Sequence, residues 1–171
     1  MLNILNTEPT SQTNLYLYVM TKLLSILFSL CLLVLALQPA TAQKADDVLG
    51  VWKNGEGTAL IQIYKKGDSK YYGKLVWLKV PNDAQGKPKT DINNPDEKLR
   101  SVQLKGFENL RGFTYAGVGV WEDGQIYDPK NGSDYSCKMT LTDANTLEVR
   151  GFIGISILGR TDVWKRQLKK G

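Results

Sequence analysis

The sequence predicts an all-β, antiparallel fold of about eight short strands, closed as a barrel, with one short helix in a long loop. Short alternating or aromatic runs are separated by Gly, Asn and Asp along most of the chain. No long segment after residue 43 has the periodicity of a helix. Gly50-Val51-Trp52 lies near one end of this region and a basic strand ends at Arg166 near the other. This pattern is typical of an antiparallel barrel or sandwich.

The N-terminus resembles a targeting segment rather than part of the fold. Leu23 to Leu37 carries no charge and is shorter than the roughly 20 residues of an ordinary membrane span. Lys22 precedes it and Ala40-Thr41-Ala42 follows as a small-x-small cleavage site, as in secretory signal peptides. An uncleaved anchor is the alternative. We expect residues 1–19 to be an over-extended gene start and residues 20–42 to be a signal peptide that begins at Met20. Residues 43–171 would then form one exported β-barrel domain.

The predicted strands follow one another with short turns. In the long run from Lys70 to Val80, alternation places Tyr71, Leu75 and Trp77 on one face. Glu122-Asp123-Gly124 is predicted to be a hairpin turn. The predicted strands are Val48–Lys53, Thr58–Lys65, Lys70–Val80, a run from Gly112 to Trp121, Gln125–Tyr127, Asp134–Leu141, Thr146–Ile153 and Arg160–Arg166.

The predicted helix lies in the long loop that begins at Pro81. Asn94 is expected to be its N-cap, since Pro95 suits the first helical position and Glu97 stands three residues after Asn94, as in a capping box.

The composition excludes several function classes. The chain has 22 basic and 17 acidic residues, for a net charge of +5, and the two signs are interleaved. We expect weak attraction to anionic surfaces, and no nucleic-acid partner because no basic helix is present. The chain has no histidine, which removes the commonest metal ligand and general base. It also lacks a cysteine pair for zinc and a phosphate-binding loop, so we expect no cofactor and no bound metal.

Cys137 is the one cysteine after residue 42. It alternates with Met139 and Leu141, which predicts a buried, inert thiol rather than a reactive one.

Polar residues beside the predicted loops are the candidates for a ligand site. Asp91 to Asp96 could also form a calcium loop, although the spacing and distal Glu of an EF-hand are missing. Turn and cap roles explain the same residues. The candidates are Asp91, Asp96, Arg100, Tyr127 and Asp128.

Trp52 is predicted to help close the barrel. The first and last strands of a closed barrel are neighbours, so Arg160 or Arg166 could cover the Trp52 ring by a cation–π contact. Other aromatic residues could line a cavity, with core packing as the alternative. These are Tyr72, Trp77, Tyr115, Trp121, Tyr127 and Trp164.

From Val48 to Arg166 the chain resembles the bacterial exported family of unknown function DUF2147. The residues that carry the resemblance are Gly50-Val51-Trp52, Asp91 to Asp96 with Leu99-Arg100, Gly124 to Pro129, Tyr135-Ser136-Cys137, Arg150 to Gly154, and Gly159-Arg160-Thr161 with Trp164 and Arg166. After Arg100 the family tends to have Arg-Pro, where this chain has Ser101-Val102-Gln103. The resemblance implies export and a small β-rich domain, and supplies no activity or catalytic residue. The Gly-x-Trp motif and the terminal Arg are also similar to lipocalin-type (calycin) barrels.

These observations lead to three hypotheses of function. The first is a non-enzymatic protein of the bacterial cell envelope, periplasmic or extracellular, that binds a small apolar or lipid-like ligand in the barrel mouth. Its mature form would not span a membrane. The second is an envelope interaction or structural protein, which requires an exposed apolar patch. The third is a carboxylate-dependent hydrolase, which requires Asp91, Asp96 and Asp128 to converge in one pocket.

Overall fold

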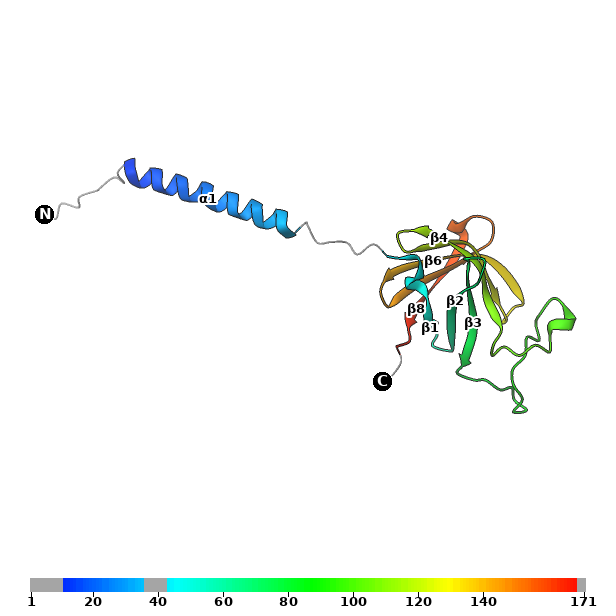
Figure 1. Ribbon diagram of the computed structural model, residues 1–171. Helices are drawn as coiled ribbons and strands as arrows, with labels where there is room; N and C mark the ends of the chain where they lie inside the picture. The colour runs from blue at the N-terminus through cyan, green and yellow to red at the C-terminus, as the bar shows by residue number, and fades with distance from the viewer. Residues whose placement is uncertain (1–10, 36–42, 169–171) are drawn as a thin grey trace. The chain divides into compact units, whose positions relative to one another are not determined.

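The computed structural model describes residues 11–35 and 43–168, which belong to two separate units (Figure 1). The first contains one α-helix, α1 (Ser11–Leu35), which runs through Met20 without a break. The predicted start of the signal peptide therefore stays a prediction. The predicted cleavage site, Ala40-Thr41-Ala42, and the first ten residues lie outside the described part. No helix within residues 11–35 and 43–168 is both long and apolar enough to cross a membrane.

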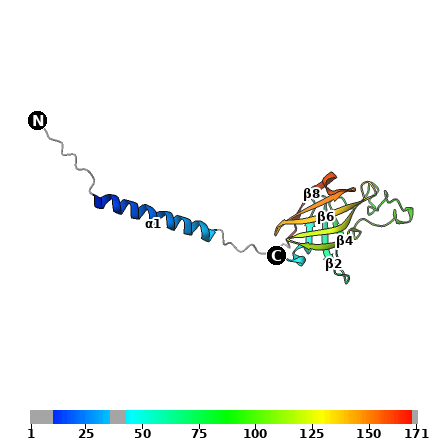
Figure 2. The same cartoon turned by 90° about the horizontal axis from the view of Figure 1, so that it is seen from above.

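The second unit confirms the predicted fold: eight antiparallel strands form a closed barrel in which each strand pairs with the next and β8 returns to β1 (Figure 2). The strands are β1 (Gly50–Lys53), β2 (Ala59–Lys65), β3 (Tyr71–Leu78), β4 (Glu108–Gly117), β5 (Val120–Asp128), β6 (Ser133–Asp143), β7 (Thr146–Phe152) and β8 (Gly159–Arg166). Three short 3₁₀ helices accompany them: η1 (Ala45–Val48), η2 (Glu97–Leu99) and η3 (Ser156–Leu158).

One end of the barrel is closed by η1 and a layer of aromatic side chains. Val48, Trp52 and Trp121 are fully buried there. The Trp52 indole N–H donates to the carbonyl of Val48 at 2.8 Å, and the Trp121 indole N–H donates to that of Ala45 at 3.2 Å. These bonds hold both indole rings against η1.

The strands β1 and β8 complete the barrel over a short seam in which Trp52 is paired with Arg166. The Arg166 guanidinium lies 4.1 Å from the centroid of the Trp52 ring. It also donates to the carbonyls of Leu49 (2.8 Å), Asp47 (2.6 Å) and Ala144 (2.7 Å). Gly50 is required here because its φ is +125° and a Cβ would meet the guanidinium at 3.1 Å. The Gly-x-Trp motif and the terminal Arg therefore both belong to the seam that closes the barrel.

Because of two β-bulges, the structure differs from two predictions that were based on alternation. The sequence prediction placed Trp77 on the same face as Tyr71 and Leu75. Instead Leu60 pairs with Trp77 and Ile61 with Leu75, so Val76 is an extra residue and Trp77 is 42% exposed.

The predicted turn at Glu122-Asp123-Gly124 was also wrong. These residues lie within β5, where the pairing with β6 shifts between Trp121 and Gly124 and Asp123 takes a positive φ of 60°. The β4–β5 hairpin turns at Val118 and Gly119, which have φ of 48° and 70°.

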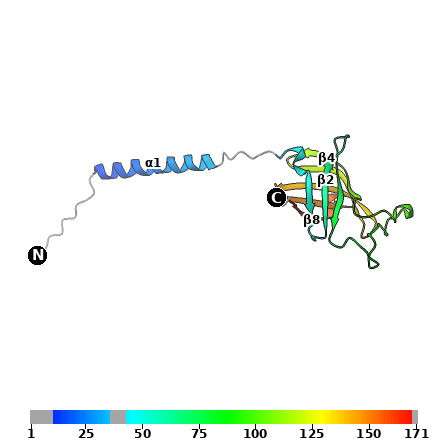
Figure 3. The same ribbon diagram turned by 60° about the horizontal axis from the view of Figure 1, so that its bottom comes forward.

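The predicted helix in the long loop is only the single 3₁₀ turn η2. Its N-cap is Asp96, which accepts a hydrogen bond from the Lys98 N–H at 3.0 Å, and not Asn94. Asn94 is buried and is used to fold the loop. This β3–β4 loop, in green in Figure 3, projects beyond the end of the barrel opposite η1.

Candidate functional site

The end of the barrel opposite η1 is hollow. A cavity of about 1260 Å³ opens there between the β1–β2 turn, the β3–β4 loop, the β5–β6 turn and the β7–β8 loop. Small-molecule sites commonly occupy roughly 300–1,000 Å³. The cavity is therefore large enough for a small molecule.

The wall of the cavity is mostly apolar. Ile61 and Leu75 lie side by side on the paired strands β2 and β3, and Ile126, Val149 and Trp164 on β5, β7 and β8 also line the cavity. A wall of aliphatic and aromatic side chains favours an apolar ligand, because the ligand and the wall both leave water on binding.

The rim is charged, with both signs present. Lys79, Lys89 and Lys130 line it, together with Arg160. Lys130 forms an ion pair with Glu56 of the β1–β2 turn at 2.7 Å, which connects two of the loops that surround the opening. The rim can thus stay in water while an apolar molecule occupies the interior.

Asp91 fastens the β3–β4 loop to the barrel. Its side chain is fully buried. One carboxylate oxygen accepts from the Tyr127 hydroxyl at 3.0 Å and the other from the Asn94 amide at 2.6 Å. Burial and the hydrogen bond to Asp91 raise the pKa of Tyr127 to about 12. Asp91 does not line the cavity, so its position is that of a structural anchor.

The five predicted ligand-binding residues are only partly brought together. Tyr127 and Asp128 line the cavity, and Asp91 lies behind Tyr127. Asp96 caps η2, while Arg100 donates to the Asn94 carbonyl at 2.9 Å and pairs with Glu97. Neither Asp96 nor Arg100 lines the cavity.

The three carboxylates required by the hydrolase hypothesis do not share one pocket. Of Asp91, Asp96 and Asp128, only Asp128 lines the cavity, and its carboxylate accepts the Lys130 backbone N–H at 3.0 Å as a turn residue. Within residues 11–35 and 43–168, no cluster of three metal-binding side chains is found.

Of the six aromatic residues predicted for a cavity, Tyr127 and Trp164 line it. Tyr115 and Trp121 pack against each other at the closed end, with ring centroids 5.2 Å apart. Tyr72 bonds to Asp68 in the β2–β3 turn. Tyr135 and Phe152, which were not among the candidates, line the cavity as well.

Sequence reasoning missed Asn109, on the cavity wall. This residue is 6% exposed, and its side-chain Oδ1 makes no hydrogen bond with any described residue. Nothing in the local sequence marks it, because a single Asn before an apolar residue is common at a strand start.

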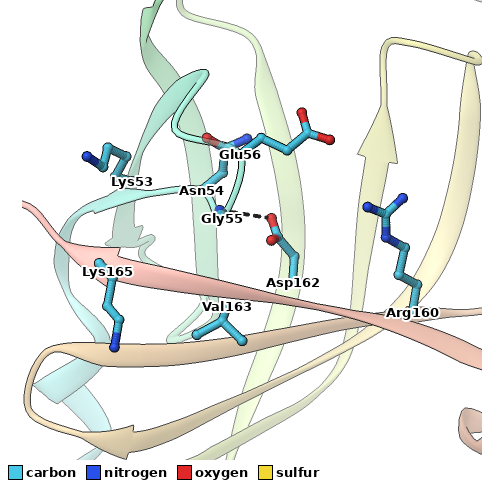
Figure 4. Close-up of a pocket in the computed structure, with 8 residues that line it drawn as sticks. All are labelled: Lys53, Asn54, Gly55, Glu56, Arg160, Asp162, Val163 and Lys165. Atoms are coloured by element: carbon cyan, nitrogen blue, oxygen red, sulfur yellow. Dashed lines mark hydrogen bonds between the residues drawn. The ribbon is translucent and has the colours of Figure 1, made fainter.

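A second, shallower pocket of about 520 Å³ lies on the seam between the β1–β2 turn and β8 (Figure 4). There the Gly55 N–H donates to the Asp162 carboxylate at 3.3 Å. Arg160 lines both pockets and is paired with Gly151 of β7, so it does not cover Trp52. Only Arg166 occupies the closure position predicted for either arginine.

The model of a bacterial protein family, described as "Uncharacterized protein conserved in bacteria (DUF2147)", matches residues 50–166. The chain belongs to this family. The matched range begins at the closure glycine, Gly50, and ends at the closure arginine, Arg166, so in this DUF2147 chain it coincides with the barrel. No curated protein matches the chain.

Among solved structures, this DUF2147 barrel is similar to protein HP1028 from Helicobacter pylori, which is described as belonging to the lipocalin family. The TM-score is 0.63 at 21% sequence identity, over 71% of this chain and 83% of that one. At this identity the likeness shows a shared fold, a lipocalin-like barrel.

Proposed function

We propose that this protein is a non-enzymatic binding protein of the bacterial cell envelope, which takes a small apolar or lipid-like molecule into the open end of its barrel. The observation that carries the proposal is the cavity of about 1260 Å³ with mostly apolar walls and a charged rim. Lipocalin-like barrels of eight strands are of a size that can hold one small ligand.

The proposed location rests on the N-terminal sequence. The uncharged run from Leu23 to Leu37, with Lys22 before it and Ala40-Thr41-Ala42 after it, supports export through a cleaved signal peptide. N-terminal sequencing of the protein from its own cells, expected to begin at Gln43, tests this part of the proposal.

Ligand binding is tested by filling the cavity. Gly151 lines it, and a Cβ there would make ordinary contacts, 3.4 Å from Ile126 and 3.6 Å from Tyr135. Gly151→Leu therefore places a side chain into the ligand space. We expect it to weaken binding of the fluorescent probe 1-anilinonaphthalene-8-sulfonate by about tenfold or more. Gly67→Leu is the matched control, because Gly67 lies in the β2–β3 turn at the closed end with open space around it.

Native mass spectrometry of the wild-type protein, purified from its own envelope, then gives the class of the ligand. We expect an additional mass on the wild type and on Gly67→Leu that is absent from Gly151→Leu. A protein that binds neither the probe nor any co-purified molecule would contradict the proposal.

A second candidate function, an envelope interaction protein, is favoured by the β7–β8 loop. Ile153, Ile155, Ile157 and Leu158 are 72%, 64%, 77% and 74% exposed in this short segment. Apolar side chains gathered in this way commonly mark a contact surface. A partner protein docked on this loop would stand beside the cavity, which Ile153 and Leu158 also line.

A photo-crosslinking residue at position 157 tests this second candidate in intact cells. The same residue at Val118, which is 90% exposed in the β4–β5 turn at the closed end, is the control. We expect a discrete crosslinked species from position 157 and none from position 118. Identical crosslinks from both positions would count against a specific partner.

A further inference from the structure

Asn109 stands at a β-bulge on the cavity side of β4. Gly73 of β3 pairs with Leu110, and the next residue, Lys74, pairs with Glu108. Asn109 is therefore the extra residue, without a partner on β3. Bulges of this kind re-aim a side chain and are frequent beside binding sites.

The bulge explains why two consecutive residues of β4 are buried. In a regular strand Leu110 and Asn109 would point to opposite faces. Here Leu110 is fully buried and Asn109 is 6% exposed. The irregular backbone thus turns a polar side chain towards the interior, where the neighbouring cavity residues Leu75 and Ile126 are apolar.

The Asn109 Oδ1 is buried and has no hydrogen-bond partner among the described residues. A buried carbonyl oxygen without a donor loses its hydration and gains nothing in exchange, so such atoms are rare in folded proteins. Asn109 lines the cavity, so a small rotation of its covered amide would let a bound molecule supply the donor that the protein does not.

The donor is expected to be uncharged. The carboxylates that line the cavity, Glu56, Asp83, Asp128 and Asp162, are exposed or half-buried. The buried carboxylate of Asp91 already accepts from both Tyr127 and Asn94 and does not line the cavity. A buried ammonium group would need such an anion beside it. A hydroxyl or an amide N–H needs only the one acceptor that Asn109 offers.

We therefore propose that the ligand is an apolar molecule with a neutral hydrogen-bond donor, a hydroxyl or an amide N–H, which the Asn109 Oδ1 accepts. This inference rests on the proposed function, since it assigns the chemistry of the molecule in the same cavity. Asn109 is then the residue that selects among molecules of equal apolar size.

The test compares two probes of equal chain length, 1-decanol and its methyl ether. Both carry the same apolar chain and an oxygen, but only the alcohol donates a hydrogen bond. Each is titrated into the full-length protein loaded with 1-anilinonaphthalene-8-sulfonate, and displacement gives the two affinities. For the wild type we expect the alcohol to bind about fivefold more tightly than the ether, as one buried hydrogen bond would provide.

Asn109→Leu removes the acceptor and keeps the branching and the number of heavy atoms of the side chain. We expect the preference to fall to about one, while the ether binds as well as before or better. Asn109→Ala serves the same purpose if leucine disturbs the bulge, and circular dichroism verifies the fold of each variant. Asn145→Leu is the matched control, an exposed Asn in the β6–β7 turn at the closed end, and it should keep the wild-type preference.

The outcomes separate the two proposals. Equal binding of both probes to the wild type, or a preference that survives in both Asn109 variants, would overturn the role of Asn109 and leave the cavity proposal intact. Failure of both probes to displace the dye would overturn this inference, and absence of dye binding would overturn the proposed function with it.

Discussion

The two ends of the barrel are built from the same eight strands but in opposite ways. At the closed end, η1 covers the opening, the indoles of Trp52 and Trp121 bond to its carbonyls, and Arg166 covers the seam. At the open end, the long β3–β4 loop and three shorter connections surround a cavity of about 1260 Å³, and the Asn109 Oδ1 is buried without a partner among the described residues.

The difference shows how one small domain can be stable and still hold a ligand. Packed aromatic side chains and satisfied polar groups stabilise a fold, whereas a cavity and an unpaired acceptor lower its stability. The closed end therefore offsets the free-energy cost of the open one. Substitutions at the closed end should affect stability, and those at the open end should affect binding.

The largest expected effect is at the closed end. Trp52→Ala removes a fully buried ring, its hydrogen bond to Val48 and the surface on which Arg166 lies. We expect a loss of about 3–5 kcal/mol in the free energy of unfolding, measured by urea denaturation of residues 43–171.

Trp77→Ala is the matched control, because the β3 bulge leaves Trp77 42% exposed. Its cost should stay below about 1 kcal/mol. Similar losses for the two variants would mean that the closed end is not the stabilising half of the barrel.

A smaller effect on stability is expected at the open end, at the anchor of the β3–β4 loop. Asp91→Asn places an amide N–H₂ against one of the two donors, the Tyr127 hydroxyl or the Asn94 amide. We expect a loss of about 1–3 kcal/mol. Trypsin should also cut faster at Lys89 or Arg100 within the loop.

Asp83→Asn provides the comparison within the same loop. The Asp83 Oδ1 accepts from the backbone N–H groups of Gln85 and Lys87, and an Asn carbonyl can replace it. Stability and cleavage should both remain near the wild type. Unchanged cleavage in Asp91→Asn would show that the loop is held by its other contacts.

The sequence predicted the closed end better than the open end. The alternation of Cys137, Met139 and Leu141 correctly indicated one buried face, with exposures of 1%, 0% and 3%. The contact between Trp52 and Arg166 followed from the geometry of a closed barrel. Both inferences depend on period-two alternation and strand order, which local sequence carries.

The site depends on features that alternation does not contain. Bulges at Val76 and Asn109 each add one residue to a strand, so that Trp77 lies outside and Asn109 inside. No residue type marks a bulge by itself, because its position is fixed by pairing with another strand. Asp91 was recognised as a polar loop residue, but its bond to Tyr127 joins two segments far apart in the sequence.

Cys137 lies at the boundary between the packed and the hollow half, and provides the most delicate measurement. It pairs with Gly124 and with Gly151, which lines the cavity. Burial raises the pKa of the Cys137 thiol from 9.0 to about 12. At pH 8 the folded protein should therefore react with a disulfide reagent roughly a thousandfold more slowly than the unfolded chain.

The raised pKa of the Cys137 thiol also makes the stability of the fold depend on pH. The unfolded thiol loses its proton first, so the free energy of unfolding should fall as pH rises from about 9 towards 12. Cys137→Val in residues 43–171 should remove the part of this loss that begins near pH 9. The part due to Tyr127, whose pKa rises from 10.0 to about 12, should remain.

The control for the reactivity of Cys137 is a Val118→Cys substitution in the Cys137→Val variant. It gives an exposed thiol that should react rapidly with the disulfide reagent. If native Cys137 reacts as fast as this control, the cavity reaches further into the barrel than its lining residues indicate.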